Sequence, residues 1–442
     1  MLCKQHSNDM YISVKKRHQV APVILVVAVG ATKAQRKELL MTQTQQKTHK
    51  GAAHNTLLAL TAAATALPGI NANAQQIAED FQFGVRHHIY EEDANAADKT
   101  LTPVLDRYDI DVNQFRLVAP INDALQLNVD YQHETMSGAS PWYTFQLPGE
   151  APKQVMSGAS IEDTRIDLSA AVKYAWDRKS ITVGVATSEE DDYDSLSGSI
   201  GFSLESADRL ATYSISADMS NDDINPVDAD IFTTRPTSEQ SKRSSSYLFS
   251  YSQILNKEAV VKVSIGHSRK SGYLSDPYKL VFVNNNLIAD NRPDSRNANT
   301  LAAQLRYFSD KLDGAAHADV RLYDDDWGIR SVTYDFAWYQ NLGNGFQLKP
   351  SLRLYSQTAA DFYQTYYTQA RADGIYSTDY RLSEYGAITY GVKLSKSFES
   401  WTLHLTAQHY ESGGNKVLAD AELENPGLLD FQLFSLGIDF RF

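Results

Sequence analysis

Three absences narrow the possible classes of protein before any motif is considered. The 442-residue chain has a single cysteine, Cys3, which removal of a leader would delete, so we expect neither disulfides nor cysteine-based catalysis in the mature protein. No apolar run approaches the roughly 18 residues that indicate a membrane helix. The net charge of −13 argues against nucleic acid as a partner, because phosphate binding requires clustered lysine and arginine. A membrane protein of this composition would cross the bilayer as strands.

Enzyme signatures are also missing from the chain. It contains no G-x-S-x-G, no H-E-x-x-H, no P-loop and no dinucleotide fingerprint. We therefore predict that the protein is not an enzyme, and we assign no catalytic residue and no cofactor. The acidic runs Glu189–Asp192 and Asp324–Asp326 are interpreted as solvated loop charge, with divalent-cation binding through carboxylate oxygens as the alternative. No metal ligand is assigned.

Apolar residues alternate with polar or small residues along much of the sequence, most clearly in Leu428–Phe442. From Phe434 to Phe442 every second residue is apolar, and the residues between them are serine, glycine, aspartate and arginine. A period of two predicts a β-strand with one apolar face. The pattern resembles the C-terminal signal of Gram-negative outer-membrane proteins. Phe440 and Phe442 are therefore predicted to act as an assembly signal for the barrel assembly machinery.

The same alternation recurs from residue 79 onward and predicts about sixteen strands, with fourteen or eighteen left open. Short turns alternate along the chain with long polar segments, as in a hairpin ladder that crosses a membrane. The long segments are 135–162, 220–243, 269–298, 358–383 and 412–427. Trp176, Trp338 and Trp401 fall beside predicted short turns, as an interfacial aromatic belt would. The predicted fold is an all-β, transmembrane, antiparallel up-and-down barrel with short periplasmic turns and long extracellular loops.

The first 74 residues are interpreted as a leader region, followed by the barrel at 75–442. Residues 41–74 form a complete signal peptide, with Lys47 and Lys50 before an apolar core and the cleavage site Ala72-Asn73-Ala74. An upstream mis-start, with Met41 as the true initiator, is the favoured explanation of the first forty residues. An unusually long leader and a membrane anchor are the alternatives.

Five motifs in the predicted barrel carry a resemblance to a known family. They are Ser137–Trp142 (SGASPW), Ser271–Lys279 (SGYLSDPYK), Arg292–Arg296 (RPDSR), Tyr323–Ile329 (YDDDWGI) and Leu354–Tyr363 (LYSQTAADFY). On these motifs the chain resembles an uncharacterised Gram-negative outer-membrane β-barrel family, catalogued as domain of unknown function thirty-five seventy. The resemblance implies a barrel in the bacterial outer membrane, and it implies no activity and no catalytic residues.

Charged residues at predicted inward positions are the candidates for function. In the second predicted strand, Tyr108, Ile110 and Val112 are assigned to the outer face and the aspartates between them to the inner face. The predicted lumen charges are Asp109, Asp111, Asp130, Arg165, Asp167, Arg306, Arg321, Asp335 and Arg353. Such charges either pair across neighbouring strands and brace the wall, which we favour, or set the selectivity of an ion path.

The loop at 269–298 is the most distinctive connection. Arg292 and Arg296 are predicted as candidates for a constriction, and a self-packed loop that covers the mouth is the favoured alternative. Val281–Val283 is interpreted as a brief strand or an apolar tip.

The leading function hypothesis is a channel or transport protein for small solutes or ions. The alternative is a non-enzymatic structural or secretion-linked barrel, closed by its loops or by a periplasmic or lipoprotein partner, and an outer-membrane hydrolase is the third hypothesis. The expected partners are outer-membrane lipid and the barrel assembly machinery.

Overall fold

The computed structural model describes residues 77–442 except 104, 158–160, 228 and 231, and these residues belong to one compact unit. The predicted leader and its cleavage site lie outside the described residues. Within the described part of the chain, no helix has the length and apolar character needed to cross a bilayer.

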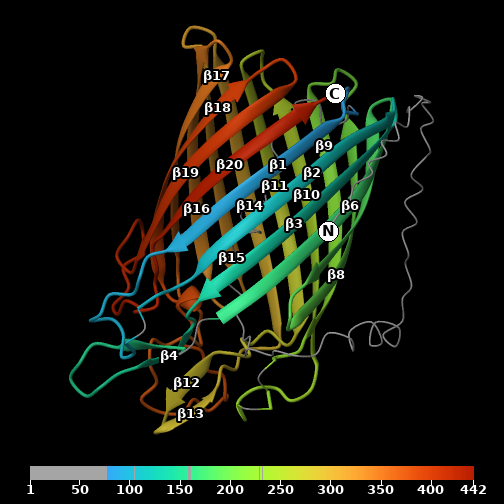
Figure 1. Cartoon of the computed structure of the whole chain (residues 1–442). Helices are drawn as coiled ribbons and strands as arrows, with labels where there is room; N and C mark the ends of the chain where they lie inside the picture. The colour runs from blue at the N-terminus through green and yellow to red at the C-terminus, as the bar shows by residue number, and fades with distance from the viewer. Residues whose placement is uncertain (1–76, 104, 158–160, 228, 231) are drawn as a thin grey trace, which may run out of the picture. The chain divides into compact units, whose positions relative to one another are not determined.

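Sixteen strands form a closed barrel in which each strand pairs antiparallel with its neighbours (Figure 1). The barrel strands are β1 (Gln82–Glu92), β2 (Asp109–Asn122), β3 (Leu125–Gly138), β6 (Ile161–Trp176), β7 (Lys179–Glu189), β8 (Tyr193–Glu205), β9 (Ala211–Ile224), β10 (Gln240–Ile254), β11 (Ala259–Gly272), β14 (Ser295–Ser309), β15 (Gly314–Asp325), β16 (Arg330–Gly343), β17 (Phe346–Gln357), β18 (Tyr385–Ser397), β19 (Trp401–Gly413) and β20 (Phe431–Arg441). The predicted all-β barrel and its strand number are confirmed.

The barrel closes where the first and last strands meet. Phe83 lies opposite Phe440, and Ile89 lies opposite Phe434, across the β1–β20 pair. The amide of Phe442 donates to the carbonyl of Phe81 at 3.0 Å. No strand edge is left at this seam, which removes the exposed hydrogen-bonding groups that an open sheet would present.

Strand pairing shows which side chains share a face, because residues directly opposite each other project to the same side. Phe83, Ile89, Phe434 and Leu436 are all exposed and share the outer face. Comparable exposed apolar side chains occur around the barrel, among them Leu168, Val183, Ile200, Ile215, Phe249, Ile265, Leu301, Leu322, Phe336, Tyr390 and Leu405. Around most of the barrel the apolar set of an alternating strand therefore faces outward, and the polar set lines the interior.

One end of the barrel has only short turns. They are 123–124, 177–178, 206–210, 255–258, 310–313, 344–345 and 398–400. Asp177 and Asn344 adopt positive φ values of 51° and 49° in two of them, a conformation that Asp and Asn tolerate better than most residues. Trp176 stacks on Tyr174, and Trp401 stacks on Phe398 beside such turns. Aromatic side chains thus gather at this end, as predicted from their positions in the sequence.

The other end has the long connections, which we call the loop layer. It comprises the described residues of 93–108, 139–160, 225–239, 273–294, 358–384 and 414–430. Two hairpins lie within it, β4 (Pro141–Phe145) with β5 (Lys153–Met156) and β12 (Leu280–Val283) with β13 (Asn286–Ala289), together with the 3-10 helix η1 (Tyr380–Leu382). Figure 1 shows β4, β12 and β13 beyond the end of the barrel that is remote from the C-terminus.

The predicted orientation of the second strand is wrong. Tyr108 and Ile110 are 3% and 1% exposed, and they pack with Tyr90 and Met136 in a buried cluster inside the barrel. Asp109 and Asp111 project to the opposite, outer face, where they lie opposite Glu91 and Ile89. The rule that apolar residues face outward assumes water inside the barrel. Beneath the loop layer the interior is packed protein, so the apolar residues of β2 turn inward.

Candidate functional site: the charged interior and the loop layer

The interior carries charges of both signs, and most of the carboxylates are paired. Arg86 contacts Asp439 at 3.0 Å, and His404 approaches the same carboxylate at 2.9 Å. Further pairs join Arg116 to Asp130, Arg165 to Asp167, Arg306 to Asp319 and Arg353 to Asp335. These pairs link neighbouring strands or neighbouring positions of one strand, so they brace the wall.

The structure places most of the predicted lumen charges on the inner face. These are Asp130, Arg165, Asp167, Arg306, Arg321, Asp335 and Arg353, which share that face with Arg86 through successive strand pairs. Asp109 and Asp111 are the exceptions, because they lie on the outer face. Whether the inward charges control a path for ions stays a prediction.

A few inward cations have no such partner. Within the described residues, Arg321, Lys262, Lys349 and Lys393 form no salt bridge. Lys349 instead lies over the ring of Tyr339, 5.0 Å from its centroid. The interior therefore combines braced ion pairs with cations that form no salt bridge among the described residues.

The predicted constriction arginines are engaged elsewhere. Arg292 lies in the loop layer, where its Nε contacts Asp290 Oδ2 at 2.7 Å and its side chain is 9% exposed. Arg296 lies in β14 and not in a loop; it pairs with Asp325 and covers the ring of Trp327 at 4.5 Å. Each guanidinium holds a carboxylate, so both residues stabilise the structure at the mouth, as the self-packed alternative predicts.

Asp379 is the centre of a buried ionic network in the loop layer. Its Oδ2 accepts from Arg292 Nη2 at 2.8 Å and from Arg381 Nε at 2.9 Å. Arg381 Nη2 also donates to Asp276 Oδ2 at 2.9 Å. Lys279 Nζ donates to the carbonyl of Pro141 at 2.9 Å, which ties this network to the β4–β5 hairpin.

In this network, neighbouring positive charges oppose the effect of burial on the pKa values of the carboxyl groups. Burial would raise the pKa of Asp276, but Lys279, Arg381 and Arg292 together outweigh it and lower the pKa to about 2. The pKa of Asp379 is lowered for the same reason. At Asp290 burial outweighs Arg292, and the pKa is raised. Asp276 and Asp379 are therefore ionised at neutral pH, as their arginine contacts require.

The loop layer joins connections from opposite sides of the barrel. Arg107, from the β1–β2 connection, and Lys279, from the β11–β14 connection, each lie over the ring of Tyr380 at 5.9 Å. These two connections are half the circumference apart in the order of the sixteen strands. Gly427, from the β19–β20 connection, packs so closely that a Cβ atom would lie 2.7 Å from Gln154 Oε1. Segments that meet in this way span the mouth.

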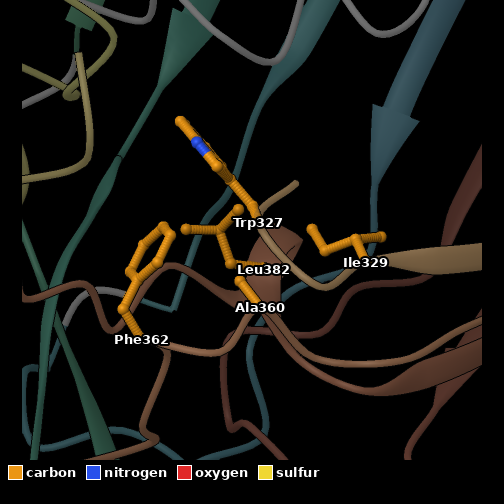
Figure 2. Packing of buried hydrophobic residues seen from close by; sticks show 5 residues of the cluster. All are labelled: Trp327, Ile329, Ala360, Phe362 and Leu382. Carbon is orange, nitrogen blue, oxygen red and sulfur yellow. The ribbon is translucent and has the colours of Figure 1, made fainter. Parts of the chain in front are cut away.

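An apolar cluster anchors the longest of these connections to the barrel rim (Figure 2). Trp327 and Ile329, from the β15–β16 turn, pack against Ala360, Phe362 and Leu382. The rings of Trp327 and Phe362 meet edge to face, with centroids 5.2 Å apart. Because these side chains are at most 5% exposed, the connection is held by a small core of its own.

One acidic cluster has the donors that a divalent cation would use. Carboxylate oxygens of Asp163, Glu190 and Asp192 all lie within 4.8 Å of one another, and oxygen ligands of this kind suit calcium or magnesium. Arg165 Nε lies 3.6 Å from Glu190 Oε1 and already supplies positive charge there. In the Asp324–Asp326 run, by contrast, Asp325 holds Arg296 and Asp324 contacts Arg330 at 3.0 Å. Asp324 and Asp325 of that run therefore form structural ion pairs.

The buried loop network was not predicted from the sequence. Arg292 is its one predicted member. The others are Asp276, Lys279, Asp290, Asp379 and Arg381, together with Arg107, whose Nε contacts Glu92 at 2.7 Å. The signal that could have indicated it is composition. Tyr273, Tyr278, Tyr363, Tyr367 and Tyr376 fall in the same connections, and so many aromatic residues in a polar loop favour packing over solvation.

A closed antiparallel barrel with an apolar outer face and a charged interior is the architecture of membrane-spanning β-barrel proteins. The chain belongs to the family described as "Protein of unknown function (DUF3570)", whose sequence model matches residues 57–430. No curated protein matches it.

The chain is also similar in fold to solved structures whose titles name a secretin, receptors, porins and a channel. The chain is similar to a bacterial polysaccharide outer-membrane secretin, with 9% identity, a TM-score of 0.45 and coverage of 82% of this chain and 98% of that one. A BenF-like porin from Pseudomonas fluorescens Pf-5 has 6% identity, a TM-score of 0.42 and coverage of 82% and 98%. CdiB from Acinetobacter baumannii has 7% identity and a TM-score of 0.46, with coverage of 82% of this chain and 60% of CdiB.

Proposed function

We propose that the protein resides in the bacterial outer membrane and passes small solutes or ions through its polar interior. The observation that carries this proposal is the set of inward cations without a salt bridge, Lys262, Arg321, Lys349 and Lys393, inside a closed sixteen-strand barrel. A barrel of sixteen strands encloses space for water. Rings of charge in such a space select the ions that pass. The proposal gives the chain no catalytic activity.

The loop layer is the restricting element in this proposal. Its arginine–carboxylate contacts and its apolar cluster hold neighbouring and more distant connections together. The ring of Tyr380 meets side chains from two connections on opposite sides of the barrel. Solutes would therefore pass through gaps in the loop layer or during its local opening, which occurs at lower free energy than unfolding of the barrel.

A second candidate function rests on the same interlocked loops. A mouth held by buried ion pairs also suits a structural or secretion-linked barrel that is closed on this side or served by a periplasmic or lipoprotein partner. In either case the barrel assembly machinery would insert the chain, with Phe440 and Phe442 as its signal, and outer-membrane lipid would surround the outer face.

Single-channel recording of the full-length protein in planar bilayers tests the proposal. The wild-type protein is compared with Asp379→Asn, which removes the charge shared by Arg292 and Arg381, and with Phe362→Ala, which weakens the apolar cluster. We expect conductance from the wild type and larger or more frequent openings from both variants. Asp373→Asn is the control, because this carboxylate of the same connection has an exposed side chain. Absence of conductance from all of these proteins would reject the channel and favour the closed barrel.

A further inference from the structure

Two lysines on the inner wall lie directly opposite each other. Lys349 of β17 and Lys393 of β18 are cross-strand partners, and like charges in this position destabilise a sheet. Within the described residues neither lysine forms a salt bridge. A sheet that keeps an unfavourable pair at an inward position gains something other than stability from it.

The neighbours of this pair add more positive charge. Lys393 has Arg86 and Lys349 among its charged neighbours, and the nearby Asp439 is already held by Arg86 and His404. In the other direction, Arg306 and Lys349 both lie near the ring of His317, which connects them and is not counted as a charge.

Lys262 extends the series, because it too has Arg306 as a charged neighbour. The carboxylate beside Arg306 is Asp319, which Arg306 holds through both of its oxygens. We call this set the basic wall, and its members are Arg86, Lys262, Arg306, His317, Lys349 and Lys393. Asp319 and Asp439 pair with Arg306 and Arg86, and Asp335, opposite Asp319, pairs with Arg353. Within the described residues the three lysines of the basic wall therefore have no carboxylate partner.

The basic wall occupies the half of the barrel nearer the short turns. Lys262 follows the 255–258 turn, Lys349 follows the 344–345 turn, and Lys393 precedes the 398–400 turn by a few residues. Half a circumference away, the strands β7 and β8 lie opposite β17 and β18. Most of their inward residues toward the same end are small and uncharged, and include Ser180, Thr182, Ser199 and Ser203, with Glu205 at the end of β8. The side facing the lysines therefore carries short side chains and a single carboxylate on these two strands.

We propose that the basic wall binds small anionic solutes that carry carboxylate or phosphate groups, and that it makes the passage selective for anions. Lysine and arginine along a pore serve this purpose in anion and phosphate channels. A bound anion would also remove the repulsion between Lys349 and Lys393. The inference rests on the proposed channel function and names the class of solute.

The test compares selectivity in planar bilayers under a potassium chloride gradient. The double variant Lys349→Glu/Lys393→Glu reverses two charges of the basic wall, and Lys349→Gln/Lys393→Gln removes them. Lys396→Glu is the matched control, because Lys396 lies on the outer face of the same strand, over Phe346. Heat-dependent mobility on denaturing gels checks that each variant has folded as a barrel.

We expect an anion-selective reversal potential for the wild type and the control, and the opposite sign for the glutamate variant. The glutamine variant should lie between them. Inorganic phosphate and a dicarboxylate, added separately, should each reduce the chloride current of the wild type but not that of the glutamate variant. If one reduces it and the other does not, that result identifies the group bound.

Two results would overturn the inference while leaving the channel intact. One is conductance without anion preference in the wild type, and the other is unchanged selectivity in the glutamate variant. If no protein conducts, including Asp379→Asn, the channel proposal fails first and the anion inference fails with it.

Discussion

In the loop layer, Arg292 and Arg381 share the wholly buried carboxylate of Asp379, and Arg107 holds the wholly buried carboxylate of Glu92. On the inner wall, Lys349 and Lys393 face each other with no carboxylate in contact. Burial makes pairing obligatory in the first region, because an unpaired charge there would cost several kcal/mol. In the proposed channel, water would remove that requirement in the second region.

The charges of the loop layer stabilise the structure, whereas we propose that the charges of the basic wall meet a solute. A loop-layer charge is embedded in contacts and contributes to stability only with its partner present. In the proposed channel, solvent would screen a basic-wall charge, so its removal should leave the barrel folded. Mutations in the loop layer should therefore change the rate of proteolysis, and mutations in the basic wall should change the ion selectivity.

The largest effect is expected from Asp379→Asn. The change leaves Arg292 and Arg381 without their shared buried carboxylate, which should cost the loop layer about 3–5 kcal/mol of local stability. Limited proteolysis should then cut the 358–384 connection much faster than in the wild type, while the barrel stays intact. Asp373→Asn removes an exposed partner of Arg371 and should change the local stability little, because water and salt screen such a pair. Equal cleavage of the two variants would contradict the distinction between the regions.

Phe362→Ala should have a similar effect by a different cause. The change removes the ring that meets Trp327 and leaves a cavity in the cluster, at a cost of about 3 kcal/mol. Faster proteolysis of the same connection, without any change in ion selectivity, is the expected outcome. Leu423→Ala is a suitable control, because Leu423 is an exposed side chain of the neighbouring connection.

Acid should loosen the loop layer before it affects the basic wall. Because the pKa of Asp276 is lowered to about 2 in the folded protein, its contribution to stability is complete above the unfolded value of about 3.9. That contribution is lost as the pH falls toward 2, and Asp379 acts in the same direction. Asp290 acts in the opposite direction, since its pKa is raised. Pepsin cleavage, normalised to an unfolded substrate, should increase between pH 4 and pH 2.

Asp276→Asn is the control for the acid response. The variant should be cleaved faster at pH 5 than the wild type, with a smaller further increase below pH 4. A wild-type cleavage rate that is the same at pH 5 and pH 2 would show that the ionic network does not hold the loops.

The smallest effect on stability and a clear effect on selectivity are expected from Arg321→Glu. Arg321 is inward on β15 and has no salt bridge among the described residues, so reversal of its charge should move the reversal potential toward cations. Asp111→Asn changes a charge on the outer face of β2 and should leave the reversal potential unchanged. A reversal potential that changes in Asp111→Asn but not in Arg321→Glu would place the ion path outside the interior.

Much of the barrel could be predicted because its signals are local. The alternation of apolar and polar residues in Phe434–Phe442 is visible within one strand, and Asp177 or Asn344 indicates a tight turn without reference to the rest of the chain. These signals were sufficient for the strand number and for the end on which the long connections lie. The orientation of Ile110 was predicted incorrectly because it depends on what covers the barrel and not on its neighbours in sequence.

The loop network could not be predicted for a related reason. Arg381 meets Asp276 across 105 residues, and Arg292 meets Asp379 across 87. No spacing rule connects residues so far apart, and each of them resembles an ordinary loop charge when taken alone. These ion pairs form only when the folded connections lie together over the mouth of the barrel.

The seam between β1 and β20 has a consequence for the order in which the protein forms. Arg86 and Asp439 meet across 353 residues of sequence, and loop closure over such a distance is slow. The edge of β1 cannot be covered until β20, the last strand of the chain, has formed. A sheet that has not closed has two open edges, each able to pair with another molecule. The time before closure is therefore the period in which this protein most needs protection from aggregation.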